Sequence, residues 1–324
     1  MPIIYKKISP FLLACIAFPA ANANELDVEL YGSFRLAVES VDADQADDYS
    51  GFRDAYSRIG LKASHAISDG WSVMGQVELP VDLANGEIND QFNTNDNVRI
   101  AKIQLNSPYG NVWYGKGWMA YYNYIAYPVD FFSSYYSGFA TTTSFQENET
   151  LYYVSPVFSG LQLALATSDD SGSGNDERHQ YVMSYSRNGF SIALGRDDKN
   201  GTTEPVDGIS ASYTGGPWYI AAKFEKDDNF NDVSNLLLQY QIDEKNTVRG
   251  MLANYDGYGG DILHLGWDHQ YQKDMKFFAE FYQEETHAVI ESSNNPSNWI
   301  NTPPGQPQGG SVLTVGMRYD FSFK

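Results

Sequence analysis

Residues 28–39 read Val-Glu-Leu-Tyr-Gly-Ser-Phe-Arg-Leu-Ala-Val-Glu, and this stretch decides the fold. Successive side chains of a β-strand point to opposite faces, so this alternation predicts a strand with one apolar and one polar face. The stretch is also longer than the usual strand of about 5–6 residues in soluble proteins. Its apolar face holds Val28, Leu30, Gly32, Phe34, Leu36 and Val38, and its polar face holds Glu29, Tyr31, Ser33, Arg35 and Glu39.

The same alternation recurs in further stretches, at residues 71–79, 161–166, 190–194 and 313–323. The stretch that starts at Arg99 does not fit this alternation. If Arg99 faces inward, the polar side chains of Lys102 and Gln104 would face outward. We therefore expect a bulge or a subunit interface near Arg99.

Short turns and longer connections alternate between these stretches. Seven short turns and eight longer, mostly acidic connections predict about sixteen strands. Turns at one end and loops at the other indicate an all-β fold, a transmembrane antiparallel β-barrel, rather than a soluble β-sandwich. The turns are Ser68–Gly70, Ser107–Gly110, Val157–Gly160, Arg187–Gly189, Gly215–Pro217, Asp243–Asn246 and Gln272–Met275. The longer connections include Val41–Asp54, Pro80–Asp96, Trp118–Glu149, Asp169–Arg178, Lys199–Asp207 and His287–Gly310.

The start of the chain has the features of a secretory signal peptide. Two lysines precede the mostly apolar residues 8–20, and Ala21-Asn22-Ala23 forms a cleavage site of the A-x-A type. We expect residues 1–23 to be removed and residues 24–324 to form one barrel domain. An alternative takes Cys15 as the cleavage site of a lipoprotein, after a shorter apolar core.

Composition excludes several classes of protein. The net charge of −20 becomes −22 when the two leader lysines are lost, and such an acidic chain is repelled by the phosphates of nucleic acids. Cys15 is the one cysteine, so a protein cleaved after Ala23 has no disulfide. No later segment approaches the roughly 20 apolar residues that a spanning helix needs.

No group of residues predicts catalysis. The five histidines are scattered, and neither a nucleophile–base pair nor a phosphate-binding, dinucleotide-binding or zinc motif is present. We therefore expect no enzymatic activity, no cofactor and no metal centre. The acidic stretches 42–48 and 169–177 leave calcium binding, or cation bridging to lipopolysaccharide, as an alternative, although they lack the spacing of a calcium-binding loop.

The last predicted strand carries an assembly signal. Gly316, Tyr319 and Phe321 fit the glycine-x-x-aromatic-x-aromatic pattern of the closing strand of outer-membrane proteins, and Phe323 adds a further ring. The barrel assembly machinery reads this pattern, so we expect it as a partner. Phe323 is followed by Lys324, whereas many such chains end on Phe.

Several short motifs also follow one another in a characteristic order. They are Leu30-Tyr31-Gly32, Ser57 to Lys62, Gly70 to Glu78, Arg99 to Ala101, Tyr114 to Lys116 and Tyr153 to Gly160. In order and spacing they resemble the Gram-negative trimeric general porins, over essentially all of residues 26–323. The resemblance implies a homotrimer of 16-stranded barrels in outer-membrane lipid and lipopolysaccharide, exported through the periplasm of a Gram-negative bacterium.

The resemblance also implies a constriction site. In that family the third loop folds into the lumen, and its acidic residues face basic residues of the opposite wall. Here that loop is Trp118–Glu149, where Pro128-Val129-Asp130-Phe131-Phe132 replaces the usual Pro-Glu-Phe-Gly-Gly turn. The basic wall also departs from the family pattern, because Tyr153 occupies a position that is often arginine in that family. The implied wall residues are Arg35, Arg58, Arg99, Lys62 and Lys116, and the implied acidic residues are Asp130, Glu147 and Glu149.

Tyrosines crowd the same loop, at positions 121, 122, 124, 127, 135 and 136. Tyr121, Tyr122, Tyr124 and Tyr127 would either form an aromatic track for sugar rings or hold the loop against the wall. We expect a water-filled channel for passive diffusion of ions and small hydrophilic solutes, weakly selective for cations. A saccharide-selective porin is the alternative, and a barrel enzyme or a surface adhesin is a more distant one.

Overall fold

The computed structural model describes residues 26–44, 48–89, 97–136, 140–169, 177–199, 205–227, 232–255, 259–286, 289–290 and 309–324. The predicted signal peptide, residues 1–23, lies outside them, as do most residues of the acidic stretch 169–177.

The described chain is almost entirely β-strand. Its strands are β1 (Asp27–Ala43), β2 (Tyr49–Asp54), β3 (Arg58–Ser68), β4 (Trp71–Pro80), β5 (Ile100–Ser107), β6 (Gly110–Trp118), β7 (Gln146–Val154), β8 (Leu161–Asp169), β9 (Glu177–Arg187), β10 (Phe190–Lys199), β11 (Val206–Gly215), β12 (Trp218–Asp227), β13 (Val233–Gln241), β14 (Asn246–Tyr255), β15 (Gly260–Gln272), β16 (Met275–Glu284) and β17 (Gly310–Phe323). Two short helices, η1 (Tyr122–Ala126) and η2 (Tyr127–Val129), interrupt them. No helix in the described ranges is long and apolar enough to span a membrane.

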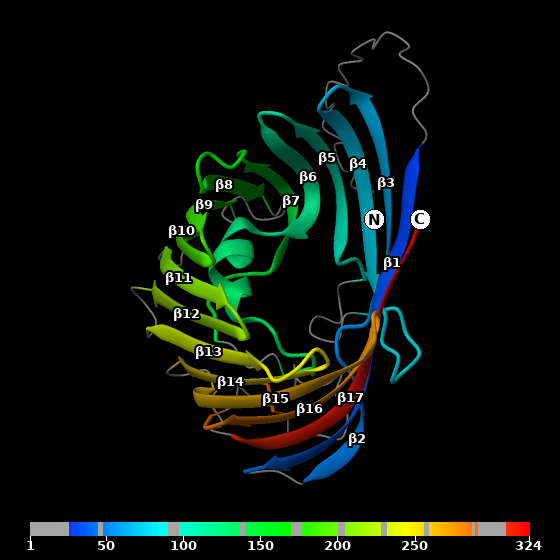
Figure 1. Ribbon diagram of the computed structural model, residues 1–324, viewed down its shortest axis with the longest axis vertical. Coiled ribbons are helices and arrows are strands. Elements are labelled where there is room, and N and C mark those ends of the chain that lie inside the picture. The colour runs from blue at the N-terminus through cyan, green and yellow to red at the C-terminus, as the bar shows by residue number, and fades with distance from the viewer. Residues whose placement is uncertain are drawn as a thin grey trace, which may run out of the picture.

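The strands close into a barrel (Figure 1). From β3 to β17 each strand pairs antiparallel with the next, and β1 pairs with β17 on one side and with β2 and β3 on the other. β2 and β3 are two halves of one wall strand, interrupted at residues 55–57, where Tyr56 has φ 65°. Counting them together gives the sixteen strands that the succession of turns predicts, so the predicted fold is confirmed.

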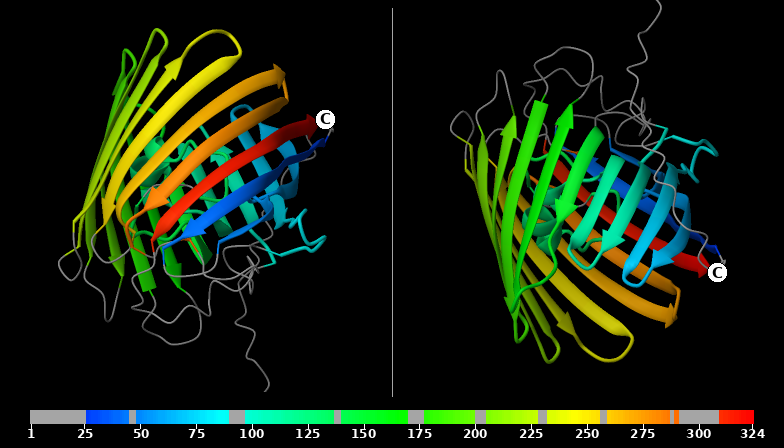
Figure 2. Two further views of the ribbon diagram at one scale, coloured as in Figure 1. Left: turned by 90° about the horizontal axis from the view of Figure 1, so that it is seen from below. Right: turned by 90° about the horizontal axis from the view of Figure 1, so that it is seen from above.

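The wall is apolar outside and polar inside, as the alternation in β1 predicts. Leu30 and Val38 are 40% and 49% exposed on the outer face, whereas Arg35 and Glu39 are 9% and 2% exposed on the inner face. Figure 2 shows the long tilted strands of the barrel. Exposed apolar side chains occur on strands all around it. An apolar outer face suits contact with membrane hydrocarbon, and a polar inner face suits contact with water or polar side chains.

All seven predicted short turns are present, between consecutive strands from β3 to β16. Two predicted connections are too long, however. Residues 41–54 are mostly strand, because Leu36–Val41 of β1 form a ladder with Tyr49–Asp54 of β2. The strand after the third long connection starts at Gln146, where it pairs with Trp118 of β6, so that connection ends earlier than predicted.

The closing strand carries its aromatic residues on the outer face. Tyr319, Phe321 and Phe323 follow one another with ring centroids 5.7 and 5.6 Å apart. Phe321 covers Gly32 of β1, where a Cβ atom would lie 2.4 Å from the ring. Gly316 is equally crowded, since a Cβ atom there would lie 2.4 Å from the ring of Phe278. The packing of Phe321 on Gly32 covers the seam between β17 and β1, whereas Phe278 on Gly316 packs the neighbouring pair β16 and β17 on the inner face.

Candidate functional site

The connection between β6 and β7 folds into the barrel (Figure 1). Its first half forms η1 and η2, which lie inside the ring of strands against β10 to β13. Residues 137–139 are outside the described part of this loop. A segment in this position narrows the lumen.

Glycines in the wall make room for the loop. A Cβ atom at Gly208 of β11 would lie 2.0 Å from the hydroxyl of Tyr121 and 2.9 Å from a side-chain carbon of Ile125. At Gly195 of the neighbouring β10, a Cβ atom would lie 2.8 Å from Ile125. Both loop side chains are fully buried, so they pack directly on the backbone of the wall.

Buried polar side chains of the wall hold the loop backbone. The carboxylate of Glu280 accepts hydrogen bonds from the amides of Ser133 and Ser134, at 2.7 and 2.9 Å. Asn235 both accepts from and donates to the backbone of Ala140, at 2.9 Å each. Loop amides that would otherwise be buried without partners are thus satisfied, which fixes the position of the loop. The same role is served by Gln180, which binds the amide of Tyr121, and by Glu225, which binds the amide of Thr142.

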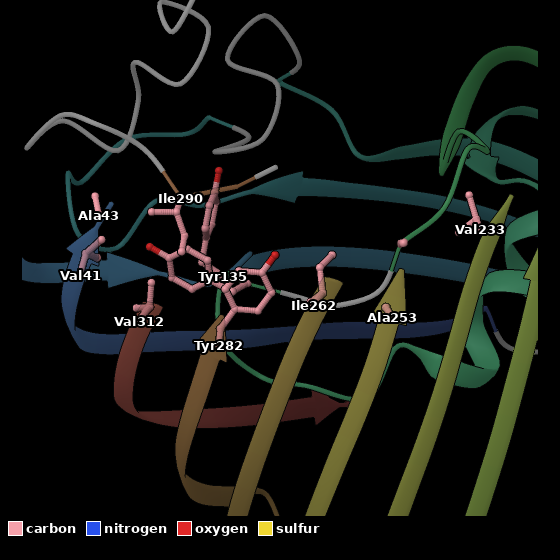
Figure 3. Close-up of a cluster of buried hydrophobic side chains, with 11 residues drawn as sticks. Val41, Ala43, Tyr135, Val233, Ala253, Ile262, Tyr282, Ile290 and Val312 are labelled. Carbon is pink, nitrogen blue, oxygen red and sulfur yellow. The ribbon is translucent and has the colours of Figure 1, made fainter. Parts of the chain in front are cut away.

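An apolar cluster and an arginine clamp the far end of the loop. Tyr135 lies among side chains from β1, β13 to β17 and the loop (Figure 3). The guanidinium of Arg53 lies 4.3 Å from the ring centroid of Tyr135 and donates to the hydroxyl of Tyr136 at 3.3 Å. Arg53 also pairs with Glu39 at 3.0 Å. The loop is therefore attached at several points around the lumen.

Basic side chains form a row on the wall opposite η1 and η2. In the strand register, Arg58 of β3 lies opposite Ser33 of β1, Arg35 of β1 lies opposite Arg318 of β17, and Arg318 lies opposite Lys276 of β16. We call Arg58, Arg35, Arg318 and Lys276 the basic row. Its four side chains come from four neighbouring wall strands, so they face the lumen side by side.

Asp130 faces this row from the loop. It follows η2 and accepts a hydrogen bond from the hydroxyl of Tyr122 at 2.6 Å. Burial raises the pKa of the Asp130 carboxyl, and the hydrogen bond from Tyr122 and the positive charges of Arg35, Arg58 and Arg318 oppose that shift. This part of the loop thus presents one carboxylate across the lumen from several cations.

Of the other predicted wall residues, Arg99 lies next to the basic row, because Arg58 and Arg99 approach the same carboxylate oxygen of Glu78, at 4.0 and 3.0 Å. Arg99 precedes β5, pairs with Glu78 at 3.0 Å and lies over the ring of Trp118 at 5.7 Å. Arg99 lies before β5, which begins at Ile100, so the inward orientation of Arg99 does not set the alternation of that strand. Lys102 is therefore not turned outward, and the conflict expected from the sequence does not arise. Lys62 pairs with Glu29 at 3.3 Å, closer to the rim where β1 begins, and Lys116 is buried beside an irregularity in the β6–β7 register.

The structure places the predicted acidic and aromatic loop residues in different environments. Glu147 and Glu149 are on β7, not in the loop, since that strand begins at Gln146. Glu147 pairs with Arg178 of β9. Tyr121 and Tyr122 are buried at 0% and 5% exposure, Tyr124 is half-buried and donates to Gln162 at 2.9 Å, and Tyr127 is 52% exposed.

Several charged residues that face the lumen were not identified from the sequence. Arg318 had a usable signal, because it lies out of phase with the outward-facing Val315, Met317 and Tyr319 and so must face inward. Lys276 and Arg249 both bind Asp268, at 2.7 and 2.6 Å, and nothing in the local sequence indicates this cluster. Within the described ranges, no group of three His, Cys, Asp or Glu side chains could hold a metal ion.

Comparison with known proteins places the chain in a family. A family model described as Gram-negative porin matches residues 12–288. No curated protein sequence matches the chain.

Solved porin structures share the fold. The anion-selective porin from Comamonas acidovorans is 17% identical and covers 92% of this chain and 100% of its own, with a TM-score of 0.67. OmpF of Salmonella typhi, in complex with daunomycin, is 17% identical over 92% of this chain and 98% of its own, with a TM-score of 0.65. OmpT of Vibrio cholerae, in its trimer form, is 14% identical over 92% of this chain and 100% of its own, with a TM-score of 0.63.

The family and the fold together indicate a channel for passive diffusion rather than an enzyme. Since the matching family model spans most of the sequence, the chain belongs to the Gram-negative porin family and is an outer-membrane protein.

Proposed function

We propose that the chain is a general porin, weakly selective for cations, that passes ions and small hydrophilic solutes through a constriction set by Asp130 and the basic row. One observation carries this proposal: Asp130 directly follows η2 in the inward-folded loop, and the basic row lies on wall strands across the lumen from that helix. Opposite charges across a narrow aqueous path create a transverse field that orients water and polar solutes and disfavours apolar ones.

The cation preference comes from outside the constriction. Near Asp130 the described charges are net positive. The carboxylates of Asp130, Glu78, Asp268 and Asp320 face the basic row and also Arg99 and Arg249, which share Glu78 and Asp268 with it. The excess negative charge of the protein must therefore act mainly at the entrances, where the sequence places its acidic connections. The porin of Comamonas acidovorans is anion-selective with the same fold, so the fold alone does not decide the sign.

Zero-current potentials of the purified protein in planar bilayers test this proposal. We expect cation preference at low salt that shrinks as salt rises, because exposed charges are screened within about 8 Å at physiological ionic strength. A preference for anions at low salt would refute the proposed selectivity, and the absence of any conductance would refute the channel.

Replacing both Arg58 and Arg99 with serine should increase cation selectivity and admit larger uncharged sugars. The double substitution removes two positive charges and two long side chains from one side of the path, while the carboxylates remain. Ion selectivity in bilayers and sugar uptake in liposomes measure the two effects.

Asp130→Asn should shift selectivity in the opposite direction, toward anions, with little change in the size limit for sugars. It is the matched control, because it removes charge and keeps nearly the same volume. If both variants conduct and select as the wild type does, the constriction lies elsewhere in the lumen.

The saccharide-selective alternative is less favoured by the tyrosines. Tyr121, Tyr135 and Tyr136 are each at most 2% exposed, packed between loop and wall. This packing supports the role of holding the loop in place, and only Tyr127 among the loop tyrosines named as a track is more than half exposed.

Assembly and export complete the proposal. The Vibrio cholerae porin with this fold is described in a trimer form, which supports a homotrimer in lipid and lipopolysaccharide here. We also propose that residues 1–23 are a cleaved signal peptide and that Gly316, Tyr319, Phe321 and Phe323 are recognised by the barrel assembly machinery.

A further inference from the structure

A row of aromatic rings crosses the inward-folded loop. It runs from Trp118 through Tyr122, Tyr127 and Phe131 to Tyr219 of β12, with successive ring centroids 4.5, 6.2, 5.9 and 4.8 Å apart. We call these five residues the aromatic row. It begins beside Arg99 and passes Asp130, so it lies at the same constriction as the charged groups.

Four members of the aromatic row are at least partly accessible, whereas Tyr122 is buried at 5% exposure and supports the others from behind. Tyr127 is 52% exposed, and Trp118, Phe131 and Tyr219 are half-buried. Its positions are nevertheless fixed, because Tyr122 donates to Asp130 at 2.6 Å and Tyr219 donates to the carbonyl of Pro128 at 2.8 Å. Rings that are held in place and left accessible can contact a passing solute rather than only support the loop.

Two opposite charges stand next to these rings. Asp130 is hydrogen-bonded to a member of the aromatic row, and Arg35 and Arg58 belong to the basic row on the facing wall. In the described part of the chain, no carboxylate forms an ion pair with Arg35, whose Nε instead donates to the hydroxyl of Ser33 at 3.0 Å. Arg35 is 9% exposed at the lumen wall, so its remaining guanidinium nitrogens can be approached only by a group that enters the constriction, and that group would have to be anionic.

We propose that this constriction preferentially binds aromatic zwitterions, solutes with a flat ring, an ammonium group and a carboxylate, such as aromatic amino acids. The proposal rests on the channel function above. The ring would stack on Tyr127 and Phe131. The ammonium group would meet Asp130 and the neighbouring ring faces, and the carboxylate would meet Arg35 and Arg58 across the path.

The three groups of the solute must act together. An aliphatic amino acid has both charges but no ring to stack, and an aromatic acid or amine lacks one of the charges. A neutral saccharide can stack on the rings but leaves both charges of the site without an ionic partner. Because an aromatic zwitterion has no net charge, its binding is compatible with weak cation selectivity.

Block of ion current through single channels in planar bilayers tests the proposal. The probes are L-phenylalanine, L-leucine, phenylacetate, phenethylamine and maltose. We expect L-phenylalanine to block at the lowest concentration, with L-leucine needing about threefold to tenfold more, the factor that corresponds to one aromatic contact.

Two variants locate the site. Tyr127→Ser combined with Phe131→Ser should remove the difference between L-phenylalanine and L-leucine while the channel still conducts. Tyr127→Ser alone, at the most exposed ring, should reduce it. Tyr109→Ser is the matched control, since Tyr109 is 75% exposed at a short turn away from the constriction, and it should leave the difference unchanged.

Each result has a defined meaning. Block by phenylacetate or phenethylamine at the same concentration as L-phenylalanine, equal block by L-phenylalanine and L-leucine, or a difference that survives the double substitution would overturn the proposal. Stronger block by maltose would overturn it in favour of a saccharide site. Conducting channels in all these cases would leave the proposed function intact, whereas the absence of conductance would overturn both.

Discussion

A protein that lacks residues 321–324 should fail to form a barrel and should accumulate unassembled in the periplasm. The deletion removes the partners of Leu30, Tyr31 and Gly32 at the seam between β17 and β1. Backbone groups left without partners in lipid cost several kcal/mol each. It also removes Phe321 and Phe323, two rings of the predicted assembly signal. Fractionation of the outer membrane, with heat-modifiable migration on gels, measures the amount of folded protein.

Removal of Lys324 alone is the control for this deletion. Lys324 forms an exposed ion pair with Asp27 at 3.3 Å, and exposed pairs contribute about 0–1 kcal/mol, so assembly should be normal. Wild-type amounts of folded, membrane-inserted protein after the longer deletion would contradict the role given to the closing strand.

Gly208→Val should displace the inward-folded loop and lower single-channel conductance. The new side chain would occupy the space of the Tyr121 ring and of Ile125, and such overpacking costs about 1–3 kcal/mol. Because Glu280 and Asn235 still hold the loop farther along, it should shift toward the lumen rather than leave it. Single-channel recordings and the thermal stability of the purified protein measure the two effects.

Gly75→Val provides a matched control on another wall strand. Gly75 lies on the exposed outer face of β4, and a Cβ atom there would meet nothing within 4 Å. This variant should therefore conduct and melt as the wild type does. If Gly208→Val also behaves as the wild type, the close packing between loop and wall is wrong.

The barrel was predictable from the sequence because its wall is periodic. The parity of β1 and β3 places Arg35 and Arg58 on the inner face, and in the structure both lie on the wall across the lumen from η2 and Asp130. The same reasoning applied to β17 would have added Arg318, whose neighbours Met317 and Tyr319 face outward. Parity gives only the face of a residue, however, and its partner depends on the register with the next strand.

The interior of the constriction was not predictable, because the loop has no period. The contact of Tyr121 with Gly208 joins residues far apart in the chain. It depends on a glycine that the sequence alone does not distinguish from other residues of a strand. The boundary of the loop was missed for a related reason. Glu147 and Glu149 look like loop residues in the sequence, but pairing with β6 extends the strand through them.

The central claim is that the loop carries Asp130 into the conducting path, opposite the basic row. The single cysteine of the chain, Cys15, lies in the predicted signal peptide, so Asp130→Cys would introduce a unique thiol in the cleaved protein. Single-channel conductance of this variant, recorded before and after reaction with a bulky neutral thiol reagent, tests the claim directly. We predict a clear stepwise fall in conductance, whereas Tyr109→Cys should show none. Unchanged conductance after complete labelling of Asp130→Cys would contradict the account.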